Sequence, residues 1–216
     1  LEIRRKDPLD SYHALNEGWS NNPWSFEDVG LGTGSFTVSY CNQDNEEKAV
    51  RYGLMDETAK ININLSSAKV LTNLLSLLAG LNEQAALNLA YCIIDWRDAD
   101  SFFQHPQYGA EDEDYKNLSS PYESKDSEFE TIEELLLVKG MEQEIFEKIK
   151  DFITVYGEGK VNINTVSRPV LLVLDLSPDL ATKIIKFRSG EDLISGSFDD
   201  NIFSSVSGIV PDLTAD

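Results

Sequence analysis

Two acidic runs, joined by one loop, are the residues of this sequence best suited to chemistry. They read Asp95-Trp-Arg-Asp98-Ala-Asp100 and Glu111-Asp112-Glu113-Asp114-Tyr115, and the loop between them contains His105 and Gly109. Calcium takes about six to eight oxygen ligands, so carboxylates and carbonyls without thiols or paired imidazoles suit it. The spacing is not that of an EF-hand, because Gly109 stands where a bidentate Glu is required. The runs therefore suit an irregular calcium site, although an acidic run by itself is more often a solvated face.

Paired carboxylates can also act as general acid and general base, which makes Asp98 and Glu111 a conceivable hydrolytic pair. The sequence has no nucleophile elbow, no Gly-rich phosphate loop and no His-x-x-x-His pair to support such chemistry. His13 and His105 are isolated, and we expect them at the surface. We therefore expect no enzymatic activity.

The charge of the chain restricts its partners. Among 216 residues, 38 are acidic and 18 are basic, which gives a net charge of −20. Over half of that charge lies between Asp95 and Asp151, where 17 acidic residues face 6 basic ones. Such a chain repels the phosphates of nucleic acid and anionic lipid and attracts cations.

Cysteine content and hydropathy add little to this restriction. Cys41 and Cys92 are too few for a disulfide framework or a zinc ribbon, although one bridge between them is possible. No stretch approaches the roughly 20 apolar residues that a membrane helix needs. The sequence starts at Leu1 without an initiator Met, which suggests that it has been trimmed.

One supersecondary unit occurs twice. Lys60-Ile-Asn-Ile-Asn64 recurs as Lys160-Val-Asn-Ile-Asn164, and Ile93 to Arg97 aligns with Ile184 to Arg188. Each copy predicts a helix, a turn and a second helix. Ser66 or Ser67 is placed to cap the first helix in the first copy, and Ser167 in the second. A third helical pair is expected from Thr131 to Phe152, with Thr131 and Glu134 as a capping box and Gly140 at the turn.

The residues before the first copy predict strands. Ser35–Tyr40 and Ala49–Met55 alternate apolar and polar side chains on either side of a turn, which favours a β-hairpin. Ile61 and Ile63 are then expected to point inward. A short helix is expected around Ser11 to Glu17.

The helical pairs resemble helix-hairpin-helix units, many of which bind DNA through backbone amides at the turn. Their turns here carry scarcely a basic residue to hold the phosphate backbone. Packing or partner contact is therefore favoured over DNA binding.

Seven motifs in this order resemble the minor pseudopilin K family of type II secretion systems. They are Asp10 to Trp19, Asp56-Glu57 with Lys60 to Asn64, Asp95 to Asp100, Gly109 to Asp112, Pro121-Tyr122, Glu134 to Gly140, and Lys160 to Thr165. The resemblance implies an α+β, mostly α fold, in which a small pseudopilin-like β-sheet carries a large helical insert. We expect a helix remnant and hairpin in residues 1–58 and the insert in 59–216, with helix-hairpin-helix-like units near 60–98, 131–152 and 160–190.

The resemblance also implies a calcium ion in the helical domain. Carried over by position, the candidate ligands are Asp95, Asp98, Asp100, Glu111 and Asp112. Asp95 ranks last among them, because it aligns with Lys186 in the second copy and could simply occupy a helix surface.

The same family sits at the tip of the periplasmic pseudopilus, so the resemblance implies a noncatalytic structural subunit. Its implied partners are the minor pseudopilins I and J, together with a secreted substrate or the outer-membrane channel. It also implies a location at the periplasmic face of the inner membrane, with an anchoring helix before Leu1 and returning strands after Asp216. The alternative is a helix-hairpin-helix module for DNA binding or DNA uptake.

Overall fold

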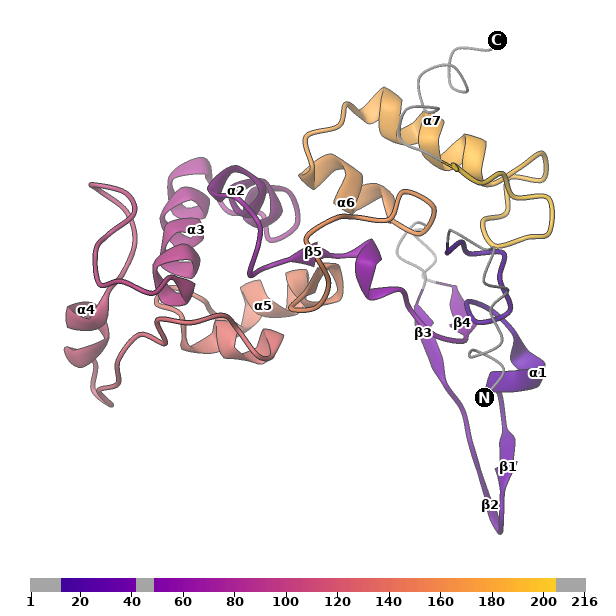
Figure 1. The fold of residues 1–216 in the computed structure, drawn as a ribbon, viewed down its shortest axis with the longest axis horizontal. Coiled ribbons are helices and arrows are strands. Elements are labelled where there is room, and N and C mark those ends of the chain that lie inside the picture. Colours follow the sequence, from indigo (N-terminus) through magenta and orange to yellow (C-terminus); the bar gives the residue numbers. More distant parts are fainter. Residues whose placement is uncertain (1–12, 42–48, 205–216) are drawn as a thin grey trace. The chain divides into compact units, whose positions relative to one another are not determined.

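The computed structural model describes residues 13–41 and 49–204 (Figure 1). The chain divides into two compact units. Unit 1 comprises Leu1–Ala59, Asn162–Leu172 and Leu176–Asp216, and unit 2 comprises Lys60–Val161 and Val173–Asp175. The fold is α+β, as expected, with small two-stranded sheets beside the helices. The division of the insert at residues 58 and 59 stays a prediction.

Unit 2 is built around a helix pair and one short parallel sheet. Its elements are β5 (Ile61–Asn62), α2 (Ala68–Leu77), α3 (Glu83–Arg97), α4 (Asp112–Lys116), the 3-10 helix η3 (Ile132–Leu137), α5 (Gln143–Ile149), the 3-10 helix η4 (Lys150–Phe152) and β6 (Ile153–Thr154). β5 pairs in parallel with β6, so that Ile61 lies opposite Ile153. Ile61 and Ile63 are both buried, which confirms the inward orientation expected for them.

Short polar contacts set the ends of the paired helices. The Ser67 side chain accepts a hydrogen bond from the Val70 amide at the start of α2, as predicted. Asn82 does the same for the Ala85 amide at the start of α3. Gly80 has a φ of 77° in the turn between them, a backbone conformation that favours glycine. The helices then bury Leu71, Leu74, Leu75, Ala86, Leu89, Ala90 and Ile93.

Unit 1 carries the strands and the second copy of the repeat. Its elements are α1 (Pro23–Phe26), β1 (Val29–Leu31), β2 (Gly34–Phe36), β3 (Ser39–Cys41), β4 (Val50–Tyr52), the 3-10 helix η2 (Glu57–Ala59), α6 (Arg168–Val173, whose last residue belongs to unit 2) and α7 (Pro178–Arg188). β3 and β4 are antiparallel, which confirms the predicted hairpin for the residues nearest its turn, whereas Ser35 and Phe36 of its first predicted strand lie in β2. The predicted turn at 42–47 lies outside the described residues. β1 and β2 form a second antiparallel hairpin that was not predicted. The helix expected around Ser11 to Glu17 is wrong for residues 13–17, which form turns, while residues 11 and 12 are not described.

Helix pairs lie at all three expected places, although the first member of the middle pair is a 3-10 helix. The Glu134 side chain accepts a hydrogen bond from the Thr131 amide (3.0 Å), as a capping box requires. Gly140 has a φ of 87° and makes the turn before α5. The designation of these pairs as helix-hairpin-helix motifs stays a prediction.

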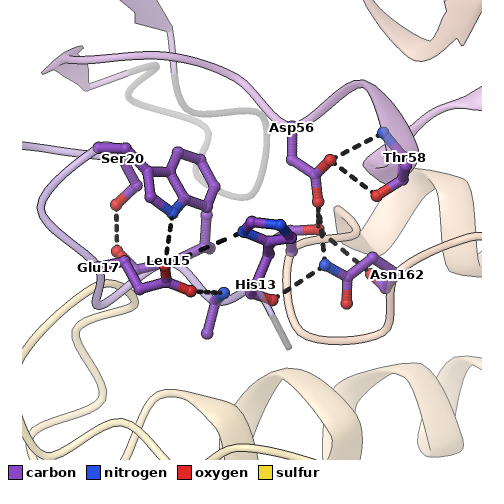
Figure 2. Close-up of polar contacts among 10 residues, drawn as sticks. His13, Leu15, Glu17, Ser20, Asp56, Thr58 and Asn162 are labelled. Carbon is purple, nitrogen blue, oxygen red and sulfur yellow. Dashed lines mark hydrogen bonds and ion pairs between the residues drawn. The ribbon is translucent and has the colours of Figure 1, made fainter. Parts of the chain in front are cut away.

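A polar network in unit 1 ties the N-terminal turn to the second copy of the repeat (Figure 2). Asp56 Oδ1 accepts hydrogen bonds from Thr58 N (2.9 Å) and Thr58 Oγ1 (2.7 Å). Asp56 Oδ2 accepts from Asn162 Nδ2 (3.0 Å) and Thr165 Oγ1 (2.7 Å). Asn162 Nδ2 also donates to the main-chain oxygen of His13 (2.9 Å). The Asp56 carboxylate thus joins residues 56–58 to the second copy of the repeat, and Asn162 joins that copy to the N-terminal turn.

The structure also describes the two cysteines and the hydropathy of the helices. Cys41 is exposed, Cys92 is buried, and neither is in a disulfide. Within the ranges 13–41 and 49–204, no helix is long and apolar enough to cross a membrane.

Candidate metal site

The first acidic run lies at the C-terminal end of α3, where the chain turns into the loop that leads to α4 (Figure 1). Asp95 is fully buried there. Its Oδ1 accepts a hydrogen bond from Gln104 N (3.1 Å) and its Oδ2 accepts one from Ala110 N (3.1 Å). A β-carbon at Gly109 would stand only 1.9 Å from Asp95 Oδ2, so the loop passes close over this carboxylate. Asp95 therefore shapes the loop.

Asp112, the first residue of α4, binds the segment around Ser124, which follows the second acidic run. Its Oδ1 accepts hydrogen bonds from Ser124 N (3.0 Å) and Ser124 Oγ (2.8 Å), and its Oδ2 forms an ion pair with Lys116 Nζ (2.8 Å). These interactions, led by Lys116, lower the pKa of Asp112. The Asp112 carboxylate is therefore occupied by protein donors, as the Asp95 carboxylate is.

Asp98 and Glu111 differ from both, because their carboxylate oxygens are buried and make no hydrogen bond of good geometry. Glu111 is 4% exposed and precedes α4 directly. The Asp114 amide donates to the Glu111 main-chain oxygen (2.7 Å). It also faces the Glu111 side chain as in a capping box, without a hydrogen bond of good geometry to it. A buried carboxylate without a partner costs free energy, which protonation or a bound cation can offset.

The electrostatics of these carboxylates point the same way. Burial, followed by the negative charges of Asp95, Asp98, Asp126 and Asp100, raises the pKa of Glu111 to about 7. Burial also raises the pKa of Asp95 to about 6, against the two amide hydrogen bonds that it accepts. The pKa of Asp98 is raised by burial too, although the Asp100 amide and the Gln104 side chain are near enough to oppose part of the rise. Several acids therefore crowd one region, in which the guanidinium of Arg97 acts electrostatically on Asp98.

Asp100 and Asp126 complete the set. Asp100 is exposed and accepts a hydrogen bond from the Phe102 amide (2.9 Å), so it holds its own turn. Asp126 was missed by sequence reasoning, yet its charge acts on both Asp98 and Glu111. It has a φ of 50°, and its amide donates to the Trp96 main-chain oxygen (3.2 Å). Its isolation from the two acidic runs hid it, and only the folded return of the chain reveals it.

The donors present are carboxylate and main-chain oxygens, which suit a hard cation such as calcium. Among the residues that the structure describes, no three His, Cys, Asp or Glu side chains are arranged so that they could hold a metal ion by themselves. Calcium accepts main-chain carbonyls and water as well as carboxylates, so a pair of unpartnered carboxylates can form the anionic part of its site. The chemistry of the donor set fits calcium, and the two orphaned carboxylates are the observation that supports the fit.

Comparison with known proteins adds a family to this geometry. Residues 48–158 match the family described as "Type II secretion system (T2SS), protein K". That range includes the first copy of the repeat, the acidic loop and the pair formed by η3 and α5. The matched segment therefore contains the whole candidate site.

Two individual proteins agree with the family match. The type II secretion system protein K of Pseudomonas aeruginosa is 29% identical over 192 residues, which cover 86% of this chain but 53% of that relative. The chain thus spans about half the length of its curated relative. A protein in the crystal structure of the GspK-GspI-GspJ complex from enterotoxigenic Escherichia coli shares the fold, with a TM-score of 0.59 and 19% identity over 81% of this chain and 61% of that one. The chain belongs to the type II secretion system protein K family.

Proposed function

We propose that this chain is the periplasmic part of a structural, noncatalytic minor pseudopilin of a type II secretion system. The match of residues 48–158 to the protein K family is the observation that carries the proposal. A location at the periplasmic face of the inner membrane, with a membrane anchor in the full-length protein, follows from the role of such a subunit. A secreted substrate or the outer-membrane channel would be its further contacts.

The proposed partners are the minor pseudopilins I and J. Support comes from the Escherichia coli crystal structure, which is of a complex of GspK with GspI and GspJ. The test is co-expression of this chain with tagged I and J proteins from the same organism, followed by affinity purification and size-exclusion chromatography. We expect the three chains to elute together. Elution of this chain alone, while I and J still associate with each other, would contradict the proposed assembly.

The noncatalytic part of the proposal is supported by the state of the reactive side chains. Burial raises the pKa of the Cys92 thiol to about 12, so this cysteine is a core residue and a poor nucleophile. His105 stacks on Tyr108 and packs at a tilt against Tyr91, at ring-centre distances of 4.6 and 4.7 Å. Asp98 and Glu111 are crowded by like charge, which a bound cation would offset.

Calcium is the cation we propose for the acidic region. Asp98 and Glu111 are the main carboxylate ligands in this proposal, with Asp126 and the exposed Asp100 as further candidates. Asp95 and Asp112 hold the surrounding chain through main-chain amides. A bound calcium ion would offset the repulsion among these groups and stabilise the folded state by mass action.

Thermal unfolding tests the calcium proposal. Saturating calcium should raise the melting temperature by about 5–10 °C relative to excess chelator, since ligand at 100 times its Kd stabilises by about 2.7 kcal/mol. The double variant Asp98→Asn/Glu111→Gln should lose the shift. Glu113→Gln, an exposed neighbour, is the matched control and should keep it. Equal melting temperatures in calcium and chelator for the unmodified chain would remove the metal from the proposal.

The alternative of a DNA-binding or DNA-uptake module has no observation in its favour. Lys139, the basic residue of the turn before α5, forms an ion pair with Asp114 (2.6 Å). A salt-dependent gel shift with duplex DNA separates the two functions. Phosphate should repel a chain of net charge −20, so tight binding at physiological salt would contradict the pseudopilin proposal and favour the DNA-binding alternative.

A further inference from the structure

The second asparagine of each repeat makes the same pair of hydrogen bonds to a distant phenylalanine. In the first copy, Asn64 Nδ2 donates to Phe129 O (2.9 Å), and Phe129 N donates to Asn64 Oδ1 (2.8 Å). In the second copy, Asn164 Nδ2 donates to Phe203 O (3.0 Å), and Phe203 N donates to Asn164 Oδ1 (2.8 Å). Both phenylalanines are buried. We call each such pair of bonds an asparagine clasp.

The two clasps close equivalent segments of the chain. In each copy an arginine at the end of the second helix donates to the turn before the first helix: Arg97 Nη2 to Ser66 O (2.5 Å) and Arg188 Nη1 to Val166 O (2.7 Å). The chain then leaves the helix and returns to the clasp. The first clasp therefore closes residues 98–128, whereas the second closes residues 189–202.

Only the first closed segment contains the candidate metal site. The candidate site begins with Asp98 and includes Glu111. Its last residue is Asp126, three positions before Phe129. The stretch from 126 to 129 is held at both ends, because the Asp126 amide donates to Trp96 O and Phe129 is held by Asn64. The charge of Asp126 acts on both Asp98 and Glu111, so the place of this stretch affects the whole anionic group.

We propose that Asn64 is a positioning residue for the calcium site. Asn64 binds both polar groups of the Phe129 main chain. It thereby positions the segment with Asp126 relative to the carboxylates of Asp98, which follows α3, and Glu111, which precedes α4. Asn64 itself contacts no ligand in this account, and it acts through the register of the returning chain. The proposal rests on the proposed calcium function, and it assigns a role to the repeat that the repeat alone does not indicate.

The second copy supplies a matched control that few proteins offer. Asn64→Ala and Asn164→Ala remove the same two hydrogen bonds from the same local geometry, but only the first lies in unit 2 with the acidic residues. Both variants should lower the melting temperature in excess chelator. A purely structural role for Asn64 predicts the same calcium affinity for both variants.

Calcium titration calorimetry on the 216-residue chain tests the proposal, with folding of each variant checked by circular dichroism. We expect Asn64→Ala to weaken calcium binding by about tenfold to a hundredfold, the usual range for groups that orient metal ligands, and Asn164→Ala to leave it unchanged. Equal affinities for the two variants would overturn the positioning role while leaving the calcium site in place. Absence of calcium binding by the unmodified chain would instead refute the proposed calcium function, and the inference would fall with it.

A second variant covers the case in which Asn64→Ala does not fold. Asp126→Asn keeps the clasp and the shape of the side chain, and its position is only half-buried. It should weaken calcium binding at least tenfold, because the asparagine clasp affects the site only by positioning the Asp126 carboxylate. An unchanged affinity for Asp126→Asn would show that the clasped segment brings nothing to the site and would overturn the proposal.

Discussion

Among single residues, Glu111 gives the strongest support for a bound cation. It is 4% exposed, neither of its carboxylate oxygens has a hydrogen-bond partner, and burial with like charge raises its pKa to about 7. Its folded pKa is above its unfolded one, so without a cation the folded state loses stability as the pH rises from about 4.5 to about 7. A cation reverses that sign, because it favours the ionised form.

This reversal predicts opposite effects of one substitution. In excess chelator at pH 8, Glu111→Gln should stabilise the chain by roughly 1 kcal/mol, since it removes a buried, repelled charge. In saturating calcium the same variant should be less stable than the unmodified chain, since it loses a ligand. Urea unfolding in the two buffers measures both values, with Glu113→Gln as the exposed control. Destabilisation in chelator would contradict the account of Glu111.

Asp56 shows the contrasting case of a carboxylate whose charge is fully used. Burial alone would raise its pKa, but hydrogen bonds from Thr165, Thr58 and Asn162 lower it overall. A lowered folded pKa means that the stabilisation is present above the unfolded pKa of about 4 and is lost as the pH falls below it.

Asp56→Asn should therefore cost about 2 kcal/mol at pH 7, since hydrogen bonds to a charged group are lost. It should also flatten the fall in stability between about pH 4 and pH 2. Chemical unfolding across that range is the measurement. Glu158→Gln, whose carboxylate is 87% exposed beside Lys160, is the control and should keep the slope of the unmodified chain. A slope for Asp56→Asn as steep as that of the control would contradict the role of Asp56.

The sequence singled out acidic residues as candidate calcium ligands, and their role as ligands stays a prediction. Composition and resemblance led to Asp95, Asp98, Asp100, Glu111 and Asp112, and all of these except Asp112 act electrostatically on one another in the folded chain. Which oxygens are left without donors depends on amides that approach from residues 104, 110 and 124. Those approaches are set by the path of the loop, which has no periodicity from which it could be read.

At the scale of elements, the loop between α3 and α4 depends on one glycine. Gly109 has a φ of 115°, and a side chain there would strike Asp95 Oδ2. Gly80 in the turn between α2 and α3 also has a positive φ, but a β-carbon there meets nothing within 4 Å. A side chain at Gly80 would therefore cause backbone strain alone, whereas one at Gly109 would also cause a steric clash.

Gly109→Ala should therefore be more harmful than Gly80→Ala. The second change should cost about 1 kcal/mol through backbone strain alone, with the calcium-dependent rise in melting temperature intact. The first should cost about 3 kcal/mol and reduce that rise, because Asp95 must leave the Gln104 and Ala110 amides. Melting curves of both variants in calcium and chelator make the comparison. Equal losses for the two variants would show that the approach of Gly109 to Asp95 is unimportant.

Elements with several turns or a clear alternation were predicted correctly, whereas some of the shorter ones were not. α2, α3 and α7 coincide with expected helices, and β3 pairs with β4 as expected. The segment Ile132–Leu137 became a 3-10 helix, since an isolated helix this short has little propensity of its own and follows its packing. β5 and β6 are two residues each, too short for a period-two signal, and their pairing across 92 positions depends on tertiary contacts.

At the scale of the whole molecule, the net charge of −20 is a second possible source of any calcium effect. Self-repulsion destabilises a compact chain of this charge, and any salt relieves it by screening. The screening length falls from about 10 Å at 0.1 M salt to about 3 Å at 1 M. A specific site differs from screening because its ligands bind the ion directly, at distances too short for other ions to screen.

Melting temperatures at several salt concentrations separate these sources. In excess chelator, raising NaCl from about 0.02 to 0.5 M should stabilise the chain, because it screens the acidic residues. If Asp98 and Glu111 bind calcium directly, most of the calcium-dependent rise should persist at 0.5 M NaCl. Magnesium should give a smaller rise, because it keeps its water and requires an octahedral site. A calcium effect that disappears at 0.5 M NaCl, or that magnesium reproduces in full, would assign the effect to the overall charge and leave the buried carboxylates without a specific ligand.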